Sequence, residues 1–340
     1  MSSPRPSPGG RRLPVFGRCA ANNQRTARSL DTARGSSDDE GVTVPVFLLG
    51  ATGAGKSVVA LELARARGAA ILALDAMQVY RGADIGVSKP SAAERKEIPH
   101  GGIDLADFGA TFDVARYVEH ATAFFAEQER AGRPVIIAGG TGLYFRALTQ
   151  GLCDAPPTPP ALRDELNALP LAALRARLER VDAPMIEKLA VTNPRRLIRA
   201  IAVMETTGRS LAAWQEETPP PPVREFRAFW LQRPKWELDR RIAARVEAMF
   251  DTGWVEEVRG LVTAHGTEAV GRFPGIGYRE IAEALAGEKP VADWSPVKRN
   301  ILVATRQYAK RQLTWFRRET TLQAVTLSGA ATVPPALISL

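Results

Sequence analysis

The stretch that decides the fold of this chain is Gly50-Ala51-Thr52-Gly53-Ala54-Gly55-Lys56-Ser57. It fits the pattern G-x-x-x-x-G-K-[ST], with an apolar run at 44–49 before it and a helix-forming run at 58–67 after it. A strand, a glycine-rich loop and a helix in this order point backbone N–H groups at a di- or triphosphate. Lys56 is expected to reach the phosphates, and the Ser57 hydroxyl to ligate Mg²⁺. The motif therefore predicts a polyphosphate site at residues 50–57.

Short apolar runs and helical runs alternate after this motif. Strands are expected at 44–49, 70–74 and 134–138, and helices near 56–67 and 114–131. This order predicts an α/β fold, with a P-loop NTPase-like core of parallel strands flanked by helices. Ligands bind such sheets beyond the carboxyl ends of the strands. Residues 50–57, Asp75 and residues 139–141 all follow directly after a predicted strand.

Two proline clusters, at 156–160 and 219–222, bracket a region of different composition. The sequence between them is rich in Ala, Leu, Arg and Glu at helical spacing and has no strand signal, which predicts an all-helical insertion domain at 156–221. The catalytic core then comprises 43–155 and 222–320, with one more strand at 226–231 and helices to about residue 318. The remainder, 321–340, is expected to be a frayed tail.

Composition narrows the class of protein. The chain has 340 residues, of which 45% are hydrophobic, so it has room for two domains, or for one with a large insertion, and for a proper core. No apolar stretch approaches the roughly 20 residues of a membrane-spanning helix, so no membrane partner is expected. Two cysteines and three histidines exclude a disulfide scaffold and a Cys/His zinc module. A reducing cytoplasm fits this composition, and nothing in it requires more than a monomer.

The first 42 residues differ from the rest. They are rich in Arg, Ser, Pro and Gly and have no acidic residue before Asp31, which predicts a disordered N-terminal extension. The arginine bias resembles an organellar transit peptide. The Pro and Gly breaks spoil an amphipathic helix, however, and favour a dispensable extension or a start codon placed too early.

Basic residues concentrate near the C-terminus. The formal charge is +8, and 298–318 contains seven basic residues and no acidic one. Such a run indicates an anionic macromolecular partner, or else a solvated basic face. At helical spacing one side of it carries Arg299, Arg306, Lys310 and Arg317. The opposite side carries Ile301, Tyr308 and Trp315.

Two further segments carry chemistry. The apolar strand at 71–74 ends in Asp75, a position typical of a metal ligand or general base, although a turn or helix cap is the alternative. Gln78 and Tyr80 follow and suit a nucleobase. The strand before residue 139 ends in Gly-Gly-Thr rather than in the carboxylate of many nucleotide hydrolases. The Thr141 hydroxyl can donate to an oxyanion, so this segment points away from nucleotide hydrolysis.

In combination, these segments resemble the tRNA dimethylallyltransferase (isopentenyltransferase) family. The main resemblance lies in 49–57, in 75–80 with 84–86, in 139–144 and in 304–315, with weaker support at 193–200 and 275–280. It covers residues 44–318 in the order of the family. The chain departs from the family pattern at Ala51, Ala76, Val87 and Gly101, where the family usually has Pro, Ser, Thr and His. Ala76 and Val87 remove two hydroxyls near the substrate.

The resemblance implies transfer of a dimethylallyl group from dimethylallyl diphosphate to N6 of the adenosine on the 3′ side of the tRNA anticodon. Asp75 would accept the amine proton, and the adenosine would be flipped out to reach it. Lys56, the loop N–H groups, Thr141, Arg241 and Mg²⁺ would stabilise the departing diphosphate. The tRNA contacts implied are Asp75, Ala76, Met77, Gln78, Arg195, Arg196, Arg199, Arg306, Lys310 and Arg311.

Three other functions stay open at this point. An adenylate isopentenyltransferase performs the same chemistry on free AMP or ATP, but would need neither the insertion nor the basic helix. A P-loop nucleotide kinase or ATPase is disfavoured by Gly-Gly-Thr at 139–141. A non-catalytic RNA-binding protein would not depend on Asp75.

Overall fold

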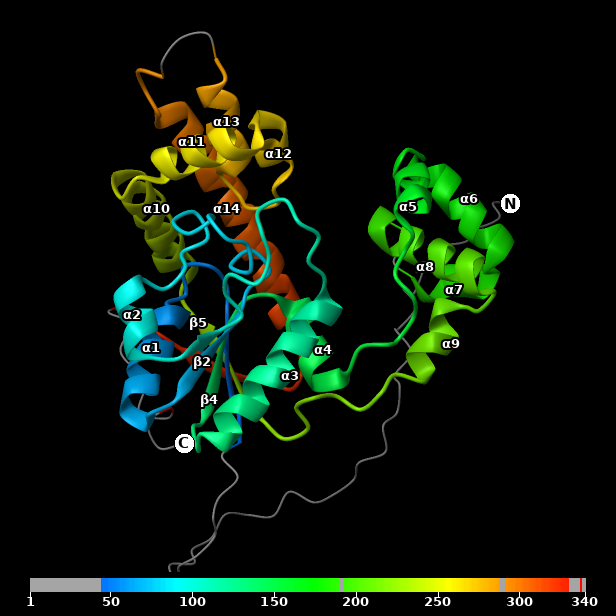
Figure 1. The fold of residues 1–340 in the computed structure, drawn as a ribbon, viewed down its shortest axis with the longest axis horizontal. Helices are drawn as coiled ribbons and strands as arrows, with labels where there is room; N and C mark the ends of the chain where they lie inside the picture. Colours follow the sequence, from blue (N-terminus) through cyan, green and yellow to red (C-terminus); the bar gives the residue numbers. More distant parts are fainter. Residues whose placement is uncertain (1–43, 190–191, 288–290, 330–336, 338–340) are drawn as a thin grey trace, which may run out of the picture. The chain divides into compact units, whose positions relative to one another are not determined.

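In the part of the chain that this computed structural model describes, six strands form a parallel sheet. The structure describes residues 44–189, 192–287, 291–329 and 337 (Figure 1). The strands lie in the order β3-β2-β4-β1-β5-β6, and each pair of neighbours is parallel. They are β1 (Val46–Leu49), β2 (Ala70–Leu74), β3 (His100–Gly101), β4 (Val135–Gly139), β5 (Arg227–Gln232) and β6 (Gln323–Thr326).

Helices cover both faces of the sheet, which explains why its inner strands read as continuous apolar runs. Alternate residues of β1 point to opposite faces: Leu48 packs with α1 (Lys56–Arg67), whereas Phe47 packs with α3 (Val114–Arg130) and α4 (Gly142–Gln150). The short helix α2 (Ala92–Glu97) begins at a capping box made by Ser91 and Glu94.

The register of the sheet brings three chain segments together. Gly139 at the end of β4 pairs with Leu49 of β1 on one side and with Leu74 of β2 on the other. The segments that follow these three residues therefore begin side by side at the carboxyl edge of the sheet. This confirms the predicted convergence of residues 50–57, Asp75 and residues 139–141.

The segment between the two proline clusters was predicted to be helical. In its described part, all of the regular secondary structure is helix. Its core is formed by leucines and isoleucines such as Leu174, Leu197 and Ile201, all fully buried. The Asn193 side chain caps the longest of these helices, and Gly208 ends it in the left-handed region at φ 67°. The helices are α5 (Pro160–Asn167), α6 (Leu171–Val181), α7 (Ala183–Lys188), α8 (Pro194–Thr207) and α9 (Leu211–Glu216).

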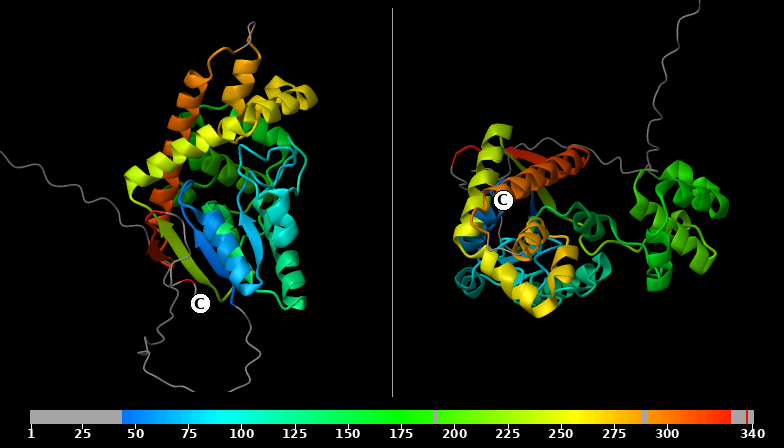
Figure 2. Two further views of the ribbon diagram at one scale, coloured as in Figure 1. Left: turned by 90° about the vertical axis from the view of Figure 1, so that its left-hand side faces the viewer. Right: turned by 90° about the horizontal axis from the view of Figure 1, so that it is seen from above.

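A second helical group follows β5. Trp254 and Tyr278 are at the centre of its core, and their rings meet edge to face at 5.8 Å. The long last helix, α14, runs from this group to the sheet and packs beside α10 (Figures 1 and 2). The helices are α10 (Lys235–Asp251), α11 (Trp254–His265), α12 (Thr267–Arg272), α13 (Tyr278–Leu285) and α14 (Ser295–Phe316).

The predicted strands and helices of the core are confirmed. The ends of β1, β2, β4, α1 and α3 lie within two residues of the predicted ends.

The prediction of a frayed tail from residue 321 is wrong for its first part. Residues 323–326 form β6, which pairs with the free edge of β5, and Leu327 is buried. A strand was not predicted here because four residues, Gln-Ala-Val-Thr, are too few to show a strand period. The predicted N-terminal extension at 1–42 lies outside the described residues.

Among the helices that the structure describes, none has both the length and the apolar character needed to cross a membrane.

Candidate active site

The P-loop at residues 50–57 joins β1 to α1. Gly53 and Gly55 adopt φ angles of 81° and 98°, which only glycine adopts readily, so these two positions fix the shape of the loop. Lys56 and Ser57 are the first two residues of α1 and face a cavity of about 470 Å³. The partial positive charge at the start of this helix favours an anion there.

Cationic side chains hold the P-loop carbonyls. Lys56 Nζ donates to the carbonyl of Ala51 at 2.9 Å, Arg241 Nε to that of Gly53 at 3.0 Å, and Arg233 Nε to that of Ala54 at 2.9 Å. With three carbonyls held in this way, the loop geometry that directs N–H groups to a phosphate is supported from several elements. Arg233 is itself buried and paired with Glu237 one helical turn later.

Asp75 lies directly after β2 and lines the same cavity as Lys56. Its Oδ1 accepts the N–H of Met77 at 2.8 Å. Burial raises the pKa of Asp75 above its usual range, against the opposing effects of this hydrogen bond and of the Lys56 and Arg245 charges. A carboxylate with a raised pKa in a cavity suits a general base.

The Gly139–Thr141 segment fits against its neighbours without room for side chains at the glycines. A β-carbon at Gly139 would lie 2.1 Å from the carbonyl oxygen of Leu74, and one at Gly140 would lie 2.2 Å from Gln312 Nε2. Thr141 Oγ1 accepts the N–H of Ala76 at 3.2 Å. This contact fixes the Thr141 oxygen beside the Asp75 segment and leaves its proton available to a ligand.

The structure separates Arg241 from the main cavity. Besides holding the Gly53 carbonyl, Arg241 lines a second cavity of about 420 Å³, which shares Lys56, Ser57 and Arg245 with the first. Of the three residues that line both cavities, Arg245 was missed by the sequence reasoning. Its position four residues after Arg241, on the same helix face, is the signal that could have identified it.

Lys56 and Arg245 form a cationic pair beside Asp75. Burial and the neighbouring Arg245 charge lower the pKa of Lys56 to about 8, although the Asp75 charge acts in the opposite direction. Burial also lowers the pKa of Arg245. Two cations held together against one carboxylate leave this part of the cavity with unbalanced positive charge, which an anionic ligand would neutralise.

The cavity also has an apolar wall, supplied mainly by helices α10, α11 and α14. Such a wall gives a place for a hydrocarbon group a short distance from the cationic end. The apolar side chains that line it include Met77, Val246, Met249, Trp254, Ile276 and Ile301.

Family models match two long stretches of this chain. The family model described as IPP transferase matches residues 78–319, and that described as isopentenyl transferase matches residues 45–103. The chain belongs to the IPP transferase family.

Relatives of this family member cover most of its length. A tRNA dimethylallyltransferase of Methylacidiphilum infernorum is 42% identical over 276 residues, which cover 81% of this chain and 83% of the relative. One from Geobacter metallireducens is 41% identical over 297 residues, covering 86% of this chain and 95% of the relative.

Solved structures agree with this assignment. The tRNA isopentenylpyrophosphate transferase from Bacillus halodurans aligns with a TM-score of 0.58 at 28% identity, covering 84% of this chain and 90% of that one. A eukaryotic dimethylallyltransferase acting on tRNA aligns with a TM-score of 0.70, covering 83% of this chain and 73% of that one. At 22% identity this second likeness shows a shared fold.

In this IPP transferase family member, the arginines predicted to contact tRNA on α8 differ in their surroundings. Arg195 lines the main cavity, and Arg196 is exposed. Arg199, in contrast, donates to the carbonyls of Ala155 and Pro156, at the start of the helical segment. Its guanidinium therefore anchors the chain where it enters that segment, which does not favour a contact with tRNA.

Helix α14 has the two-sided character that its sequence predicts. Arg306 and Lys310 are exposed, whereas Ile301 is buried. Arg311 lines the cavity and lies over the ring of Tyr308 at 5.7 Å.

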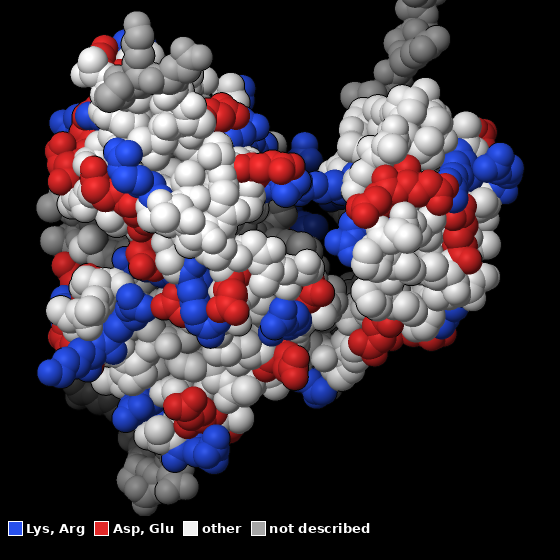
Figure 3. Space-filling model, turned by 45° about the horizontal axis from the view of Figure 1, so that its top comes forward, with Lys and Arg blue, Asp and Glu red and all other residues white. Residues whose placement is uncertain are grey.

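The molecular surface carries charges of both signs. On the face that Figure 3 shows, Lys and Arg alternate with Asp and Glu, so the basic side chains form patches and not one continuous basic surface.

Proposed function

We propose that this protein transfers a dimethylallyl group from dimethylallyl diphosphate to N6 of the adenosine on the 3′ side of the tRNA anticodon. One observation carries the proposal: the cationic P-loop end, the Asp75 carboxylate and an apolar wall all belong to one cavity. The cationic side chains would bind the diphosphate, the apolar wall would contact the prenyl group, and the carboxylate would act as the base for the amine. The names of the relatives, tRNA dimethylallyltransferase, agree with this chemistry.

In the proposed reaction the N6 nitrogen attacks the allylic carbon C1 of the donor. The N6–C1 bond forms as the C1–O bond breaks, and diphosphate leaves with the electron pair of that bond. Asp75 accepts the proton that N6 loses. Lys56, Arg245, the Thr141 hydroxyl and the P-loop N–H groups stabilise the negative charge that builds on the departing oxygens. Arg241 would support the same step by holding the Gly53 carbonyl and, from the second cavity that it lines, by attracting the negative charge of the diphosphate.

The protein side chains of the cavity could supply Mg²⁺ with only part of its ligands. The Ser57 hydroxyl lines the cavity, but no group of three His, Cys, Asp or Glu side chains within the described ranges could hold a metal on its own. Mg²⁺ commonly uses one or two protein ligands together with substrate phosphates and water. A bound Mg²⁺ would supply charge neutralisation to the diphosphate, with Ser57 as its protein ligand.

The tRNA is proposed to meet three parts of the chain. Residues 75–78 line the cavity and would contact the target base, which must leave the anticodon loop to reach Asp75. The insertion at 156–221 would contact the anticodon stem-loop through Arg195 and Arg196. Helix α14 would contact phosphates through Arg306, Lys310 and Arg311.

An adenylate isopentenyltransferase is the second candidate, because the same cavity could hold free AMP. The helical segment from α5 to α9 and the exposed basic side of α14 favour tRNA, since a mononucleotide would use neither. Purified protein, labelled dimethylallyl diphosphate and Mg²⁺ are incubated with unmodified tRNA or with AMP. Label on the adenosine next to the anticodon is the expected result, and label on AMP alone would contradict the proposal.

A further inference from the structure

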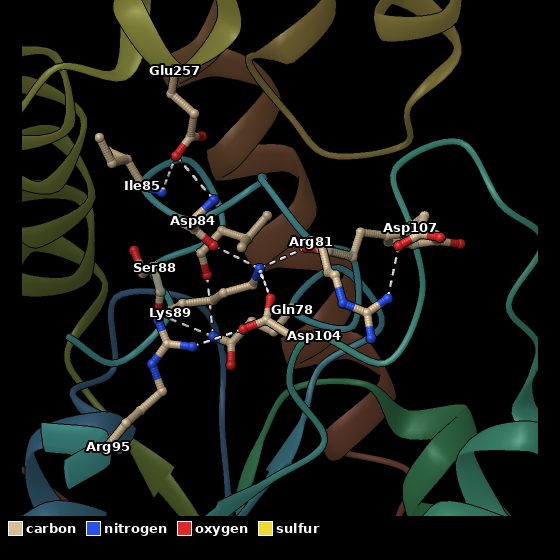
Figure 4. Close-up of polar contacts among 12 residues, drawn as sticks. Gln78, Arg81, Asp84, Ile85, Ser88, Lys89, Arg95, Asp104, Asp107 and Glu257 are labelled. Atoms are coloured by element: carbon tan, nitrogen blue, oxygen red, sulfur yellow. Dashed lines mark hydrogen bonds and ion pairs between the residues drawn. The ribbon is translucent and has the colours of Figure 1, made fainter. Parts of the chain in front are cut away.

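A single carboxylate on α11 holds the turn at 84–86, which lies beside the main cavity. Glu257 Oε2 accepts the N–H groups of Asp84 at 2.9 Å and Ile85 at 2.6 Å, and Oε1 accepts that of Gly86 at 3.3 Å. The Tyr278 hydroxyl donates to Oε1 at 2.7 Å. Figure 4 shows Glu257 reaching down from α11 to this turn. Charge-assisted bonds to several consecutive N–H groups fix the backbone of the turn in one conformation.

The other end of the same turn is held by Lys89. Its side chain is 1% exposed, and its Nζ donates to the carbonyl of Tyr80 at 2.6 Å, to Asp84 Oδ1 at 2.7 Å and to Asp104 Oδ1 at 2.6 Å (Figure 4). Arg95 pairs with the second oxygen of Asp104 at 2.7 Å. The buried ammonium therefore has three acceptors, and the segment between Asp84 and Lys89 has little freedom to rearrange.

This held segment in turn fixes the side chain of Gln78. Gln78 Nε2 donates to the carbonyls of Val87 at 3.2 Å and Ser88 at 3.1 Å. Ser88 has a φ angle of 52°, a conformation that a residue other than glycine keeps only when its surroundings impose it. An amide nitrogen carries two protons, and two carbonyls take both. The amide oxygen is then the group that Gln78, which lines the cavity, can offer to a ligand.

We propose that Glu257 is a positioning residue that selects the base through Gln78. By holding the turn it keeps the Val87 and Ser88 carbonyls on the Gln78 amide, so that the cavity presents a hydrogen-bond acceptor and no amide donor at this place. An exocyclic amino group, such as that of adenine, can donate to this oxygen, whereas a base with a carbonyl oxygen there would place two acceptors together. The inference rests on the proposed function, since it takes the Asp75 cavity as the site of the base.

The test compares anticodon stem-loop RNAs that carry adenosine or inosine at the target position. Their dissociation constants are measured at one salt concentration without the prenyl donor, so the ratio reports recognition and not chemistry. The wild-type protein is expected to prefer the adenosine RNA. Glu257→Ala should lower this preference about tenfold while leaving the affinity for dimethylallyl diphosphate unchanged. Glu256→Ala, at an exposed neighbouring position, is the matched control and should keep the wild-type ratio.

A double-variant cycle separates positioning from general loosening. Gln78→Met removes the amide at similar size and should lower the preference as Glu257→Ala does. The double variant should show little further loss, because Glu257 acts through Gln78. Additive losses would overturn the proposal, as would a wild-type protein that does not distinguish the two RNAs or a Glu257→Ala protein with unchanged preference.

Two measurements keep the outcomes distinct. Melting temperature and diphosphate affinity identify a variant that has lost its fold. If Glu257→Ala has lost its fold, Glu257→Gln is used instead, because it places an amide donor against the same N–H groups. If wild-type protein does not transfer label to tRNA, the proposed function fails. If it does transfer label but the preference is independent of Glu257, the positioning role alone fails.

Discussion

The side-chain oxygen of Gln312 accepts the backbone N–H of Thr52 at 2.9 Å, across 260 residues of sequence. The nitrogen of the same amide donates to the carbonyl of Gly140 at 3.1 Å. One buried side chain on α14 thus joins the P-loop to the segment after β4, the two walls between which the diphosphate is proposed to bind. Replacement by an apolar group would leave a backbone donor and a backbone acceptor without partners.

Gln312→Leu is accordingly expected to weaken diphosphate binding and to lower the free energy of unfolding by about 2–6 kcal/mol, because it leaves two polar groups unpaired and each costs about 1–3 kcal/mol. Calorimetric titration with diphosphate and urea unfolding measure the two effects. Gln307→Leu, at an exposed position of the same helix, is the control. Equal behaviour of the two variants would mean that the Gln312 bridge does not support the site.

Asp75→Asn should lower the rate of prenyl transfer about 10²–10⁴-fold, since an amide cannot accept the proton of the attacking amine. Single-turnover transfer to tRNA measures the rate, and a parallel binding titration should show that affinity for tRNA is retained. Asp107→Asn, at an exposed surface position, should behave as wild type. A fully active Asp75→Asn protein would show that Asp75 is not the base.

The pH dependence should have two limbs. The raised pKa of Asp75 places the acidic limb of kcat/KM above the usual carboxyl range near pH 4, because the base must be ionised. Lys56, with a pKa near 8, must be protonated to attract diphosphate, so kcat/KM should fall as pH rises through about 8. Bound diphosphate favours the charged lysine, and the alkaline limb of kcat should lie higher. Lys56→Arg should lose the limb near pH 8, because a guanidinium stays protonated there. If the limb near pH 8 persists in Lys56→Arg, it arises from the titration of another group.

Arg245→Gln is expected to lower kcat/KM for dimethylallyl diphosphate about 10²–10³-fold, the usual effect of removing one donor to a developing anion. Steady-state kinetics with varied donor concentration measure it. The nearby Arg240 is exposed and stacks over Trp236, so Arg240→Gln serves as the control. Near-wild-type activity of Arg245→Gln would indicate that Arg241, and not Arg245, stabilises the departing diphosphate.

Lys310→Gln and Arg306→Gln should each weaken tRNA binding and reduce the slope of log affinity against log salt by about one, as expected for loss of a phosphate contact. Arg306 lies 3.8 Å from Asp239, so its loss should weaken binding less than the loss of Lys310. Binding titrations between 50 and 200 mM salt (roughly the range over which phosphate contacts are resolved) provide the measurement. Unchanged slopes, matching those of an Arg130→Gln control on α3, would exclude this side of α14 from the RNA interface.

Sequence patterns predicted those parts of the molecule that depend on local physics. The glycine positions of the P-loop, the apolar runs of β1, β2 and β4, and the prolines around the helical segment each carry their signal within a few neighbouring residues. Strand β6 was missed because its signal is not local. Four mixed residues become a strand when the open edge of β5 supplies hydrogen-bond partners.

The same division applies to the site. Sequence alone determined which residue types the cavity would contain: Lys56, Ser57, Asp75 and Thr141 each follow a strand end, and parallel strands bring their carboxyl ends to one edge. Only the tertiary structure decided how Arg241, Arg245 and Gln312 divide their roles. A guanidinium on an amphipathic helix can face either side of its turn, and an amide can donate or accept. Packing of α10 and α14 against the P-loop, more than 180 residues away in sequence, makes that choice.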